Sequence, residues 1–489
     1  MRAGVILVAV VLVGIAVATY RGHRAVPQLG DVGRPVAGSD ALTAECHGVR
    51  VGPDDHVERI VRESAGETIC FRSGVYRLSE PIAPTADQQL IAEPGAVLSG
   101  AVPVWDWQRE GQLWRASAPL SSSTQPHGQC IEGDACQYPE MLFVDDRPLT
   151  RVEVRDDVGP GRFWIDSDAA VVWMADDPTG RAVELSRTPA AVVSEAQDVV
   201  VRGFVVERFA NSAQTGAIQA DGGGWTIERN DVRHNHGGGV RAHGGRVLEN
   251  HIHDNGQIGL IGTGTDQVVR GNEIDHNNIA GFDDTWEAGG TKFAYSTGLL
   301  IEGNNVHHNR GPGLWTDINN IDTTVQRNVV HDNTSHGIFH EISYAAVIRY
   351  NRVTRNGTGM PVAGWGGSGI RIAGSPDIEV HHNTLVGNQN GIMLVEQDRP
   401  DPESPLGPHI IANVTVHDND ISPMPGGLTG LVDDTGTMDS YARGVEFSDN
   451  MYRLPSPNVV VFAWRGEQWG PAAWKERFGH DASGTFSVS

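Results

Sequence analysis

The chain has 489 residues, of which Gly contributes 60 and Pro 26. This excess over average usage indicates many tight turns, while 39% hydrophobic residues and 12 Trp argue against disorder. The formal net charge of −24 repels phosphate backbones, so we expect no nucleic-acid partner. The length suits two or three ordinary domains or one long repeat array.

The N-terminal residues are typical of export. Residues 3–20 carry no charge and are flanked by arginines. Residues 16–18 (Ala-Val-Ala) fit a small-x-small cleavage site, although the run is also long enough to span a bilayer. We therefore expect residues 1–20 to be a signal peptide or a membrane anchor, followed by a linker at 21–40. In either case the body of the protein lies outside the cytoplasm.

Four cysteines agree with an exported protein. Cys46 and Cys70 flank an amphipathic helical pattern at 54–63, and Cys130 and Cys136 lie in a Gly-containing loop. Three pairings are possible, and we expect Cys46–Cys70 with Cys130–Cys136. A zinc site is the alternative, but no short metal-ligand pair accompanies these cysteines.

A phrase with two asparagines repeats along the centre of the chain. Its first copy runs from Ile227 to Asn235, and its last from Val380 to Asn388. The first Asn of each copy lies at positions 230, 250, 272, 304, 328, 351 and 383. Most intervals are 20–24 residues, which is typical of a solenoid, and the Leu frame of leucine-rich repeats is absent.

The repeat predicts a right-handed single-stranded parallel β-helix, with handedness taken from the general crossover rule. Short period-2 apolar runs are separated by Asn and Gly, which tolerate left-handed backbone at corners. Stacked turns bring like residues about 4.8 Å apart, so asparagines at one corner can form a hydrogen-bonded ladder. The sequence is therefore predicted to be all-β, with helical end caps.

The chain is divided on the same pattern. We expect an N-terminal cap helix and the first coils at 41–125, and a β-sandwich-like inserted subdomain at 126–190, where the repeat is absent. The β-helix repeats should occupy 191–455, and a C-terminal cap 456–489. Residues 471–478 resemble a capping helix that covers the open end of the solenoid.

One face of the solenoid gathers unusual residues. Counting from the Gly that follows the second Asn of each turn, the second and fourth residues should point outward. In the fourth-position column, acids occupy two adjacent turns only, at Asp317 and Glu341. The second-position column contributes Asp283, Trp315, Phe339 and Arg371 to the same face.

Two carboxylates on adjacent turns suit acid–base chemistry. Their expected backbone separation of about 5 Å resembles the carboxyl separation of retaining glycosidases. Like charges so close push one pKa upward, so one carboxyl suits general acid/base work and the other nucleophilic attack. The alternative interpretation is two solvated acids on an acidic surface.

Two long intervals add loops beside these acids, at 285–298 and 357–368, and should turn a flat face into a cleft.

Tryptophans in or beside the loops offer stacking surfaces for sugar rings or pack under the loops. His340 precedes Glu341 and is expected to orient it. The other histidines mostly adjoin the ladder asparagines, and we interpret them as turn residues, with no metal site. The predicted substrate-binding residues are Asp283, Trp286, Glu287, Lys292, Trp315, His340, Trp365 and Arg371.

The stretches Gly313-Leu-Trp-Thr-Asp317 and Gly337-Ile-Phe-His-Glu341 resemble the parallel β-helix β-xylosidase family of glycoside hydrolases. Those enzymes also carry a β-sandwich-like insertion. The opening coils, with Glu67 to Leu78 and Glu93 to Gly100, are similar to the start of many exported β-helix proteins of carbohydrate metabolism. The resemblance implies that Asp317 is the nucleophile and Glu341 the acid/base.

Three functions follow as hypotheses. The first is a retaining glycoside hydrolase that acts on a plant- or microbe-derived glycan without a cofactor. The second is a polysaccharide lyase or uronate epimerase, with Lys292 or Arg371 as base and Ca²⁺ held by carboxylates. The third is a non-catalytic glycan-binding surface protein. In each case we expect a poly- or oligosaccharide partner and a monomer.

Overall fold

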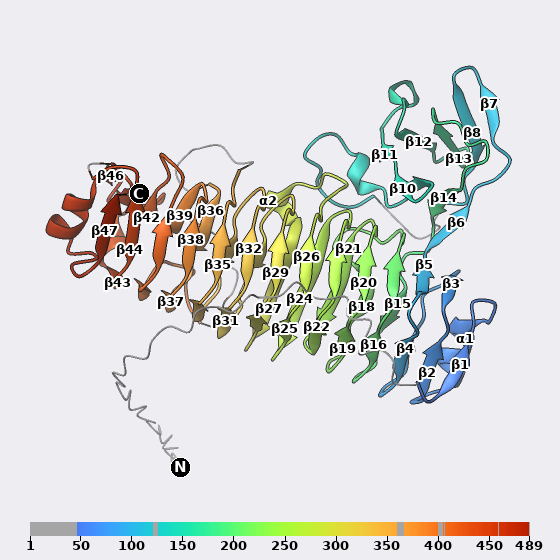
Figure 1. The fold of residues 1–489 in the computed structure, drawn as a ribbon, viewed down its shortest axis with the longest axis horizontal. Coiled ribbons are helices and arrows are strands. Elements are labelled where there is room, and N and C mark those ends of the chain that lie inside the picture. The colour runs from blue at the N-terminus through green and yellow to red at the C-terminus, as the bar shows by residue number, and fades with distance from the viewer. Residues whose placement is uncertain are drawn as a thin grey trace, which may run out of the picture. The chain divides into compact units, whose positions relative to one another are not determined.

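The computed structural model describes residues 46–120, 126–358, 366–399, 404, 406–457 and 459–488. Most turns of the chain give one strand to each of three long sheets, here called sheets A, B and C (Figure 1). Neighbouring strands in a sheet come from successive turns and pair in parallel, as Ile227 of β19 pairs with Val247 of β22; the exception is the last pair of sheet C, β45 and β46, which is antiparallel. This arrangement confirms the predicted parallel β-helix.

The strands of the three sheets are short. Sheet A contains β1 (Val49–Val51), β2 (Thr68–Phe71), β4 (Gln89–Ala92), β16 (Val200–Arg202), β19 (Thr226–Glu228), β22 (Arg246–Leu248), β25 (Val268–Arg270), β28 (Leu300–Glu302), β31 (Thr323–Gln326), β34 (Ala346–Arg349), β37 (Ile378–His381), β40 (Val414–His417) and β43 (Val445–Ser448). Sheet B contains β3 (Gly74–Arg77), β5 (Ala96–Ser99), β17 (Val205–Glu207), β20 (Asp231–Arg233), β23 (His251–His253), β26 (Glu273–Asp275), β29 (Asn305–His307), β32 (Val329–His331), β35 (Arg352–Thr354), β38 (Thr384–Val386), β41 (Asp420–Ser422), β44 (Met451–Leu454) and β47 (Thr485–Val488). Sheet C contains β15 (Val192–Ser194), β18 (Gly216–Ala220), β21 (Gly238–His243), β24 (Ile258–Thr265), β27 (Gly289–Thr297), β30 (Leu314–Thr316), β33 (Ile338–Glu341), β36 (Ser368–Ala373), β39 (Asn390–Glu396), β42 (Thr429–Asp433), β45 (Phe462–Trp464) and β46 (Glu467–Trp469).

The interior is filled by the alternate residues of these strands. Columns of Val, Ile and Leu run through all three sheets, as in Val247, Val269 and Ile301 of successive turns, which are fully buried. Period-2 alternation places every second side chain in this core and leaves the others on the outer faces. A residue's position in the strand therefore decides whether it serves packing or the surface.

The helices of the described residues are short, and the two longest lie at the ends. Helix α1 (Val57–Glu63) buries Val57 and Val61 beside the first coils. It begins three residues later than the helix predicted at 54–63. The π-helix η4 (Ala473–Arg477) buries Trp474 at the other end. The remaining helical turns are η1 (Ala135–Gln137), η2 (Arg155–Asp157), α2 (Asp284–Glu287) and η3 (Asp439–Ala442). No helix among the described residues has the length and apolarity needed to cross a membrane.

Two asparagine ladders run through the interior at two corners. In the first, each side-chain Nδ2 donates to Oδ1 of the next Asn at 2.9–3.0 Å, from Asn230 to Asn450, and the ladder ends on Asp481. The second runs from Asn235 to Asn388 with the same geometry. The ladder prediction is confirmed, and the first ladder extends beyond the repeats seen in the sequence.

The left-handed corner residue is the one before each ladder Asn. Glu249, Asp254 and His308 have φ of 53°, 50° and 54°, while the Asn itself turns inward. The expectation that Asn supplies the left-handed backbone was therefore wrong at these corners. The Asn instead satisfies buried backbone groups, as Asn309 does by donating to the carbonyl of Ile274.

An inserted subdomain of two sheets leaves the solenoid after β5. One sheet contains β6 (Ala101–Pro103), β9 (Leu142–Val144), β10 (Arg147–Pro148) and β14 (Val183–Ser186). The other contains β7 (Gln108–Glu110), β8 (Leu113–Ser117), β11 (Thr150–Arg151), β12 (Arg162–Asp166) and β13 (Val171–Met174). Both sheets contribute to one apolar core, which includes Leu142, Phe163, Val172 and Leu185.

The predicted start of this insertion at residue 126 is wrong. Strand β6 pairs with β14, and β8 pairs with β13, so residues from 101 onward belong to the insertion. Their partners lie about 60 to 80 residues later in the chain, which short-range periodicity does not reveal. A buried ion pair between Arg208 and Glu184 joins the insertion to the solenoid.

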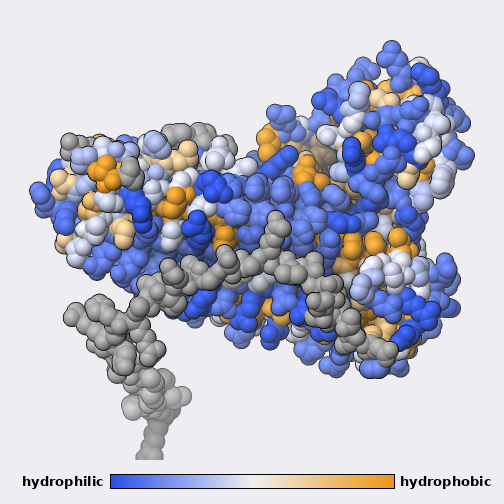
Figure 2. Space-filling view, in the orientation of Figure 1, coloured by the Kyte–Doolittle hydropathy of each residue, from blue (hydrophilic) through white to orange (hydrophobic). Residues whose placement is uncertain are grey.

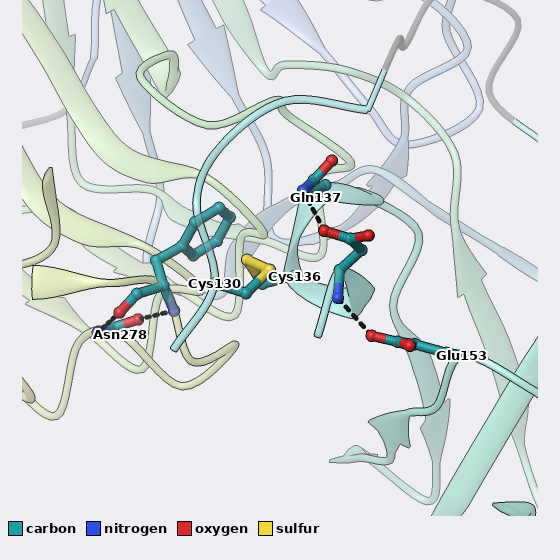
Figure 3. Close-up of a disulfide and its surroundings, with 7 residues drawn as sticks. Cys130, Cys136, Gln137, Glu153 and Asn278 are labelled. Carbon is teal, nitrogen blue, oxygen red and sulfur yellow. Dashed lines mark hydrogen bonds between the residues drawn. A yellow bond between two sulfur atoms is a disulfide. The ribbon is translucent and has the colours of Figure 1, made fainter. Parts of the chain in front are cut away.

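Both predicted disulfides are present. Cys46–Cys70 joins the chain ahead of β1 to strand β2, and Cys130–Cys136 closes a loop of the insertion (Figure 3). Cys130 also forms an isolated antiparallel bridge with Phe282, which Asn278 holds through hydrogen bonds to its backbone N–H and carbonyl. The second disulfide therefore braces the segment that leads to α2.

The predicted signal or anchor segment and the linker, residues 1–40, lie outside the described residues. The surface in view in Figure 2 is mainly hydrophilic over the solenoid strands, in agreement with the excess of 61 acidic over 37 basic residues.

Candidate functional site

The predicted site lies on the outer face of sheet C. Strands β30, β33 and β36 align Trp315 with Phe339 and Arg371. The same register continues from Thr316–His340 and brings Asp317 beside Glu341. Adjacent parallel strands are about 4.8 Å apart, so the two carboxylates are one turn apart, as predicted from their spacing.

The register of the preceding turn differs from the prediction. Ile261 pairs with Lys292 of β27, and Phe293 pairs with Thr316 of β30. Lys292 therefore occupies the second-position column where Asp283 was expected. The Gly281-Phe282 pair resembles the start of a strand, but the segment enters helix α2 and the strand begins only at Gly289. Asp283 instead caps α2, with its side chain accepting from the backbone N–H of Thr285.

The second-position column is a continuous stack of cations and rings. The Lys292 ammonium lies 4.2 Å from the ring centroid of Trp315. Trp315 and Phe339 are stacked at 5.5 Å with an interplanar angle of 12°. The Arg371 guanidinium then lies 4.5 Å from the Phe339 ring. Cation–π and stacking contacts hold each of these side chains in one position.

The two acids have different surroundings. Asp317 Oδ2 lies 3.0 Å from Lys292 Nζ, and the same ammonium lies 3.4 Å from Glu287 Oε2. Glu341 forms an ion pair with Arg399. Asp317 is 6% exposed and Glu341 4% exposed, so both are buried on a face that the sequence predicted to be open.

The surroundings of Glu341 favour its protonated form. Burial raises the pKa of Glu341 above its ordinary value, and the neighbouring charge of Asp317 raises it further. Arg399, Arg371 and Lys292 act in the opposite direction without cancelling the rise in this pKa. The predicted division into a protonated and an ionised carboxyl thus has a physical basis at Glu341.

The chain turns sharply directly after each acid. Ile318 has a φ of 56° and Ile342 a φ of 36°, which are rare values for a β-branched residue. Such backbone strain costs on the order of 1–3 kcal/mol and persists only where the surroundings enforce it. Here the next corner residues help to enforce it, since Asn320 Nδ2 donates to the Asp317 carbonyl and Ser343 Oγ donates to that of Glu341.

His340 does not orient Glu341, contrary to the prediction. Period-2 alternation points Glu341 outward and His340 into the solenoid, where its Nδ1 lies 2.8 Å from Thr316 Oγ1. His340 is 1% exposed, and burial lowers its pKa to about 3. Its role is in packing and register.

The tryptophans also differ from expectation. Trp286 packs against Phe282 and His127 in the cluster around the second disulfide, so it packs under the loop. Trp315 is 3% exposed with both faces occupied by the column. Trp365 lies outside the described residues. Arg399, by contrast, is a residue that sequence reasoning missed, since no spacing links it to Glu341, 58 residues earlier.

Several buried polar atoms lack a hydrogen-bond partner among the described residues, and a pair of them lies at the first acid. This pair is Asp317 Oδ1 and Trp315 Nε1, an acceptor and a donor from the same strand end. Buried polar groups are nearly always satisfied, so an unsatisfied one needs an explanation, and a bound ligand is one explanation. A sugar hydroxyl can satisfy both kinds of atom.

Two cavities of the described residues lie away from the paired acids. A groove of about 360 Å³ runs over β31, β34, β37 and β40 of sheet A and is lined by Asp322, Asp377 and Glu379 among others. A smaller cavity of about 150 Å³ lies between the insertion and residues 279–280. Neither is lined by Asp317 or Glu341.

The fold class is shown by comparison as well as by topology. Residues 216–368 match the family model described as "Right handed beta helix region", in agreement with the three parallel sheets of the solenoid. No curated protein matches it.

Among solved structures, the complex of XylC with xylose has a TM-score of 0.61 at 15% identity, over 79% of this chain and 78% of that chain. The periplasmic alginate epimerase AlgG has a TM-score of 0.45 at 13% identity, over 85% and 84% of the two chains. A chain described as a glycoside hydrolase has a TM-score of 0.41 at 12% identity, over 78% and 91%. At these identities the XylC likeness establishes the fold.

Proposed function

We propose that the chain is a retaining glycoside hydrolase with Asp317 as nucleophile and Glu341 as acid/base. The observation that carries the proposal is the pair of buried carboxyls on adjacent turns, in unlike surroundings. Asp317 is paired with an ammonium at 3.0 Å, while Glu341 has a raised pKa. A nucleophile must be ionised and a general acid protonated at the same pH, and this difference supports that division.

The proposed reaction has two steps. Glu341 protonates the glycosidic oxygen while Asp317 attacks the anomeric carbon, so the leaving group departs and a covalent glycosyl-enzyme forms. Glu341, now ionised, takes a proton from water, whose oxygen displaces Asp317 and releases the sugar with retained configuration. Each step uses only the two carboxyls and water, so no cofactor is required.

The neighbouring side chains suit this chemistry. Lys292 is held by Glu287 and by the Trp315 face, so it presents a fixed positive charge to Asp317. Trp315 Nε1 and Asp317 Oδ1 are buried and have no hydrogen-bond partner among the described residues, so each is available to a sugar hydroxyl once the site is uncovered. Substrate binding requires Arg399 to leave Glu341, and the loss of this ion pair favours the protonated acid.

Two alternatives are weaker. A lyase or epimerase gains some support from Arg371 and Arg399 beside Glu341, which suit a uronate carboxylate. Its proposed base Lys292 is engaged with two carboxylates, however, and cations occupy the place that Ca²⁺ would need. A calcium-dependent increase in absorbance from an unsaturated product would favour it. The third alternative, a non-catalytic glycan-binding protein, predicts binding that is indifferent to Asp317→Asn.

The decisive experiment is a panel of aryl glycosides, including β-xylosides, tested with wild type, Asp317→Asn and Glu341→Gln. Proton NMR of the first-formed product should show the configuration of the substrate. Glu341→Gln should keep activity on substrates with very acidic leaving groups, which need no protonation, and azide should accelerate it. Asp317→Asn should be inactive on all of them. Equal behaviour of the two variants would contradict the assigned roles.

We also propose that the protein is exported and acts on a poly- or oligosaccharide outside the cytoplasm. Two disulfides support export, because such bonds persist in oxidising compartments. A reporter fusion to the first 40 residues, with N-terminal sequencing of the mature protein, would separate a cleaved signal from a retained anchor.

A further inference from the structure

Histidines and acids on the corner between sheets B and C form a second cluster, away from the paired carboxyls. On successive turns the last residue of the sheet B strand and the residue that follows it are both ligand-bearing. These pairs are His253–Asp254, Asp275–His276, His307–His308 and His331–Asp332. The interpretation of these histidines as turn residues holds for the backbone of His276 and His308, whereas His253, His307 and His331 end strands β23, β29 and β32.

The two side chains of each pair converge. His276 Nδ1 lies 2.5 Å from Asp275 Oδ2, and His307 Nδ1 lies 2.8 Å from His308 Nδ1. The second member of each pair has a left-handed backbone, with φ of 52° at His276 and 54° at His308. The corner therefore turns the second side chain back toward the first.

Successive turns bring these pairs into register. Asp275 pairs with His307, and His307 with His331, along sheet B. The rings of His276 and His308 are stacked at 5.0 Å, and those of His307 and His331 at 4.8 Å. Donor atoms of Asp275, His276 and His307 all lie within 4.8 Å of one another.

We propose that Asp275, His276 and His307 bind a divalent transition-metal ion, with Zn²⁺ as the ion best matched to the donors. Two imidazoles and one carboxylate are a common zinc ligand set, with a further position open to water. His276 is about half exposed, so an ion can enter from solvent and the ring can adjust. The ion would tie two successive turns of the solenoid together.

Outer partners already orient the ligands. His251 Nε2 lies 2.8 Å from Asp275 Oδ1, and His307 Nε2 lies 3.3 Å from Glu273 Oε1. Such contacts fix the ring orientation of a ligating histidine and leave its other nitrogen for the metal. The adjacent group of His308, His331 and Asp332 is less suitable, because Arg355 already forms two hydrogen bonds to Asp332.

The test is zinc titration by calorimetry of the full chain, purified without a histidine tag. Wild type should bind Zn²⁺ saturably, and His276→Gln/His307→Gln should bind one ion fewer per chain. The matched control is His56→Gln/His243→Gln, which removes two exposed imidazoles elsewhere and should bind as wild type does. Cobalt substituted for zinc should give a visible absorption band in the wild type and lose it in the ligand variant.

If the double variant fails to fold, His276→Gln alone keeps the test available, because that side chain is exposed. It should weaken zinc binding while leaving the circular dichroism melt of the metal-free protein unchanged. Zinc binding of the ligand variants equal to that of wild type, or no saturable binding by the wild type, would overturn the proposal.

Discussion

The asparagine ladders and the second-position column of sheet C are built from the same repeat but follow opposite rules. In the ladders every turn supplies the same side chain, so each Asn is both donor and acceptor for its neighbours. In the column each turn supplies a different side chain, from Lys292 through Trp315 and Phe339 to Arg371. The side chain that is repeated on every turn stabilises the solenoid, whereas the side chains that differ from turn to turn form the candidate functional site.

The comparison is sharpest at the acids. Asp317 and Glu341 interrupt a column that continues with Ala373 and Val395, both buried and apolar. If the two regions have separate roles, variants in the column should change activity and variants in the ladders should change stability. Four predictions test this separation, from the largest expected effect to the smallest.

Glu341→Gln should lower kcat on glycosides with ordinary leaving groups by about 10²- to 10⁴-fold, since it removes general acid catalysis. The melting temperature should stay close to that of wild type, because Gln is nearly isosteric with a protonated Glu. Steady-state kinetics and a thermal melt measure the two effects. Glu446→Gln, an exposed acid on β43, is the matched control and should leave kcat unchanged. An undiminished kcat of Glu341→Gln on glycosides with ordinary leaving groups would sink the assignment.

Lys292→Met should affect both activity and stability, because Lys292 lies in the second-position column and also forms buried ion pairs. It removes the cation shared by Glu287 and Asp317, both nearly buried, and breaking such a buried pair costs about 3–5 kcal/mol. Urea unfolding measures this loss. Lys475→Met provides a comparison, since Lys475 is the other lysine of the chain and lies in the terminal helix. A loss no larger than that of Lys475→Met would show that the buried cation is dispensable.

Asn309→Ala should lower the free energy of unfolding by about 2–3 kcal/mol. Asn309 donates to Ile274 O and accepts from the backbone N–H of Asn277, and both groups would be left buried without a partner. Asn305→Ala, on the outer side of the same turn, should cost about 0.5 kcal/mol or less. Chemical denaturation compares the two, and activity below the midpoint should be preserved in both. Equal losses would contradict the role assigned to the ladder.

Arg399→Ala should change the pH profile more than the rate. The Arg399 charge lowers the pKa of Glu341, so its removal raises that pKa further. Because the acid must be protonated to donate, activity is lost as pH rises through this pKa, and the basic limb of kcat/KM should move to higher pH. Arg453→Ala removes an exposed ion pair with Asp420 and should leave the limb in place. A shift of the basic limb to lower pH after Arg399→Ala would contradict the expected rise in the pKa of Glu341.

The fold was predictable because its signal repeats. Each Asn phrase carries the same inward apolar residues, so seven imperfect copies agree on one architecture. The paired acids could also be placed, because equal spacing from a repeated Gly fixes the register on the regular turns β30 and β33. The second disulfide was accessible from local spacing, since its cysteines are 6 residues apart.

Prediction failed where the repeat breaks. Gly281-Phe282 has the Gly–apolar pattern that begins the sheet C strand on other turns. Asp283 was therefore placed in the second-position column, where Lys292 actually lies. The start of the insertion was placed too late because β6 pairs with a strand about 80 residues away. Arg399 approaches Glu341 from a segment after β39, and no pattern in one sequence encodes that contact. Burial of the acid face follows from such contacts and was likewise not predicted.

The end of the first ladder has a consequence for how such a chain can change length. Asn450 donates through its N–H and Nδ2 to Asp481, which also accepts from Tyr452 and Trp474. An ionised carboxylate accepts hydrogen bonds and has none to donate, so the series stops there. A whole turn duplicated in the middle keeps every donor matched to an acceptor. Duplication at this end would place the carboxylate inside the series and break it. Solenoids of this kind can therefore lengthen by internal copying, while their last turn stays fixed.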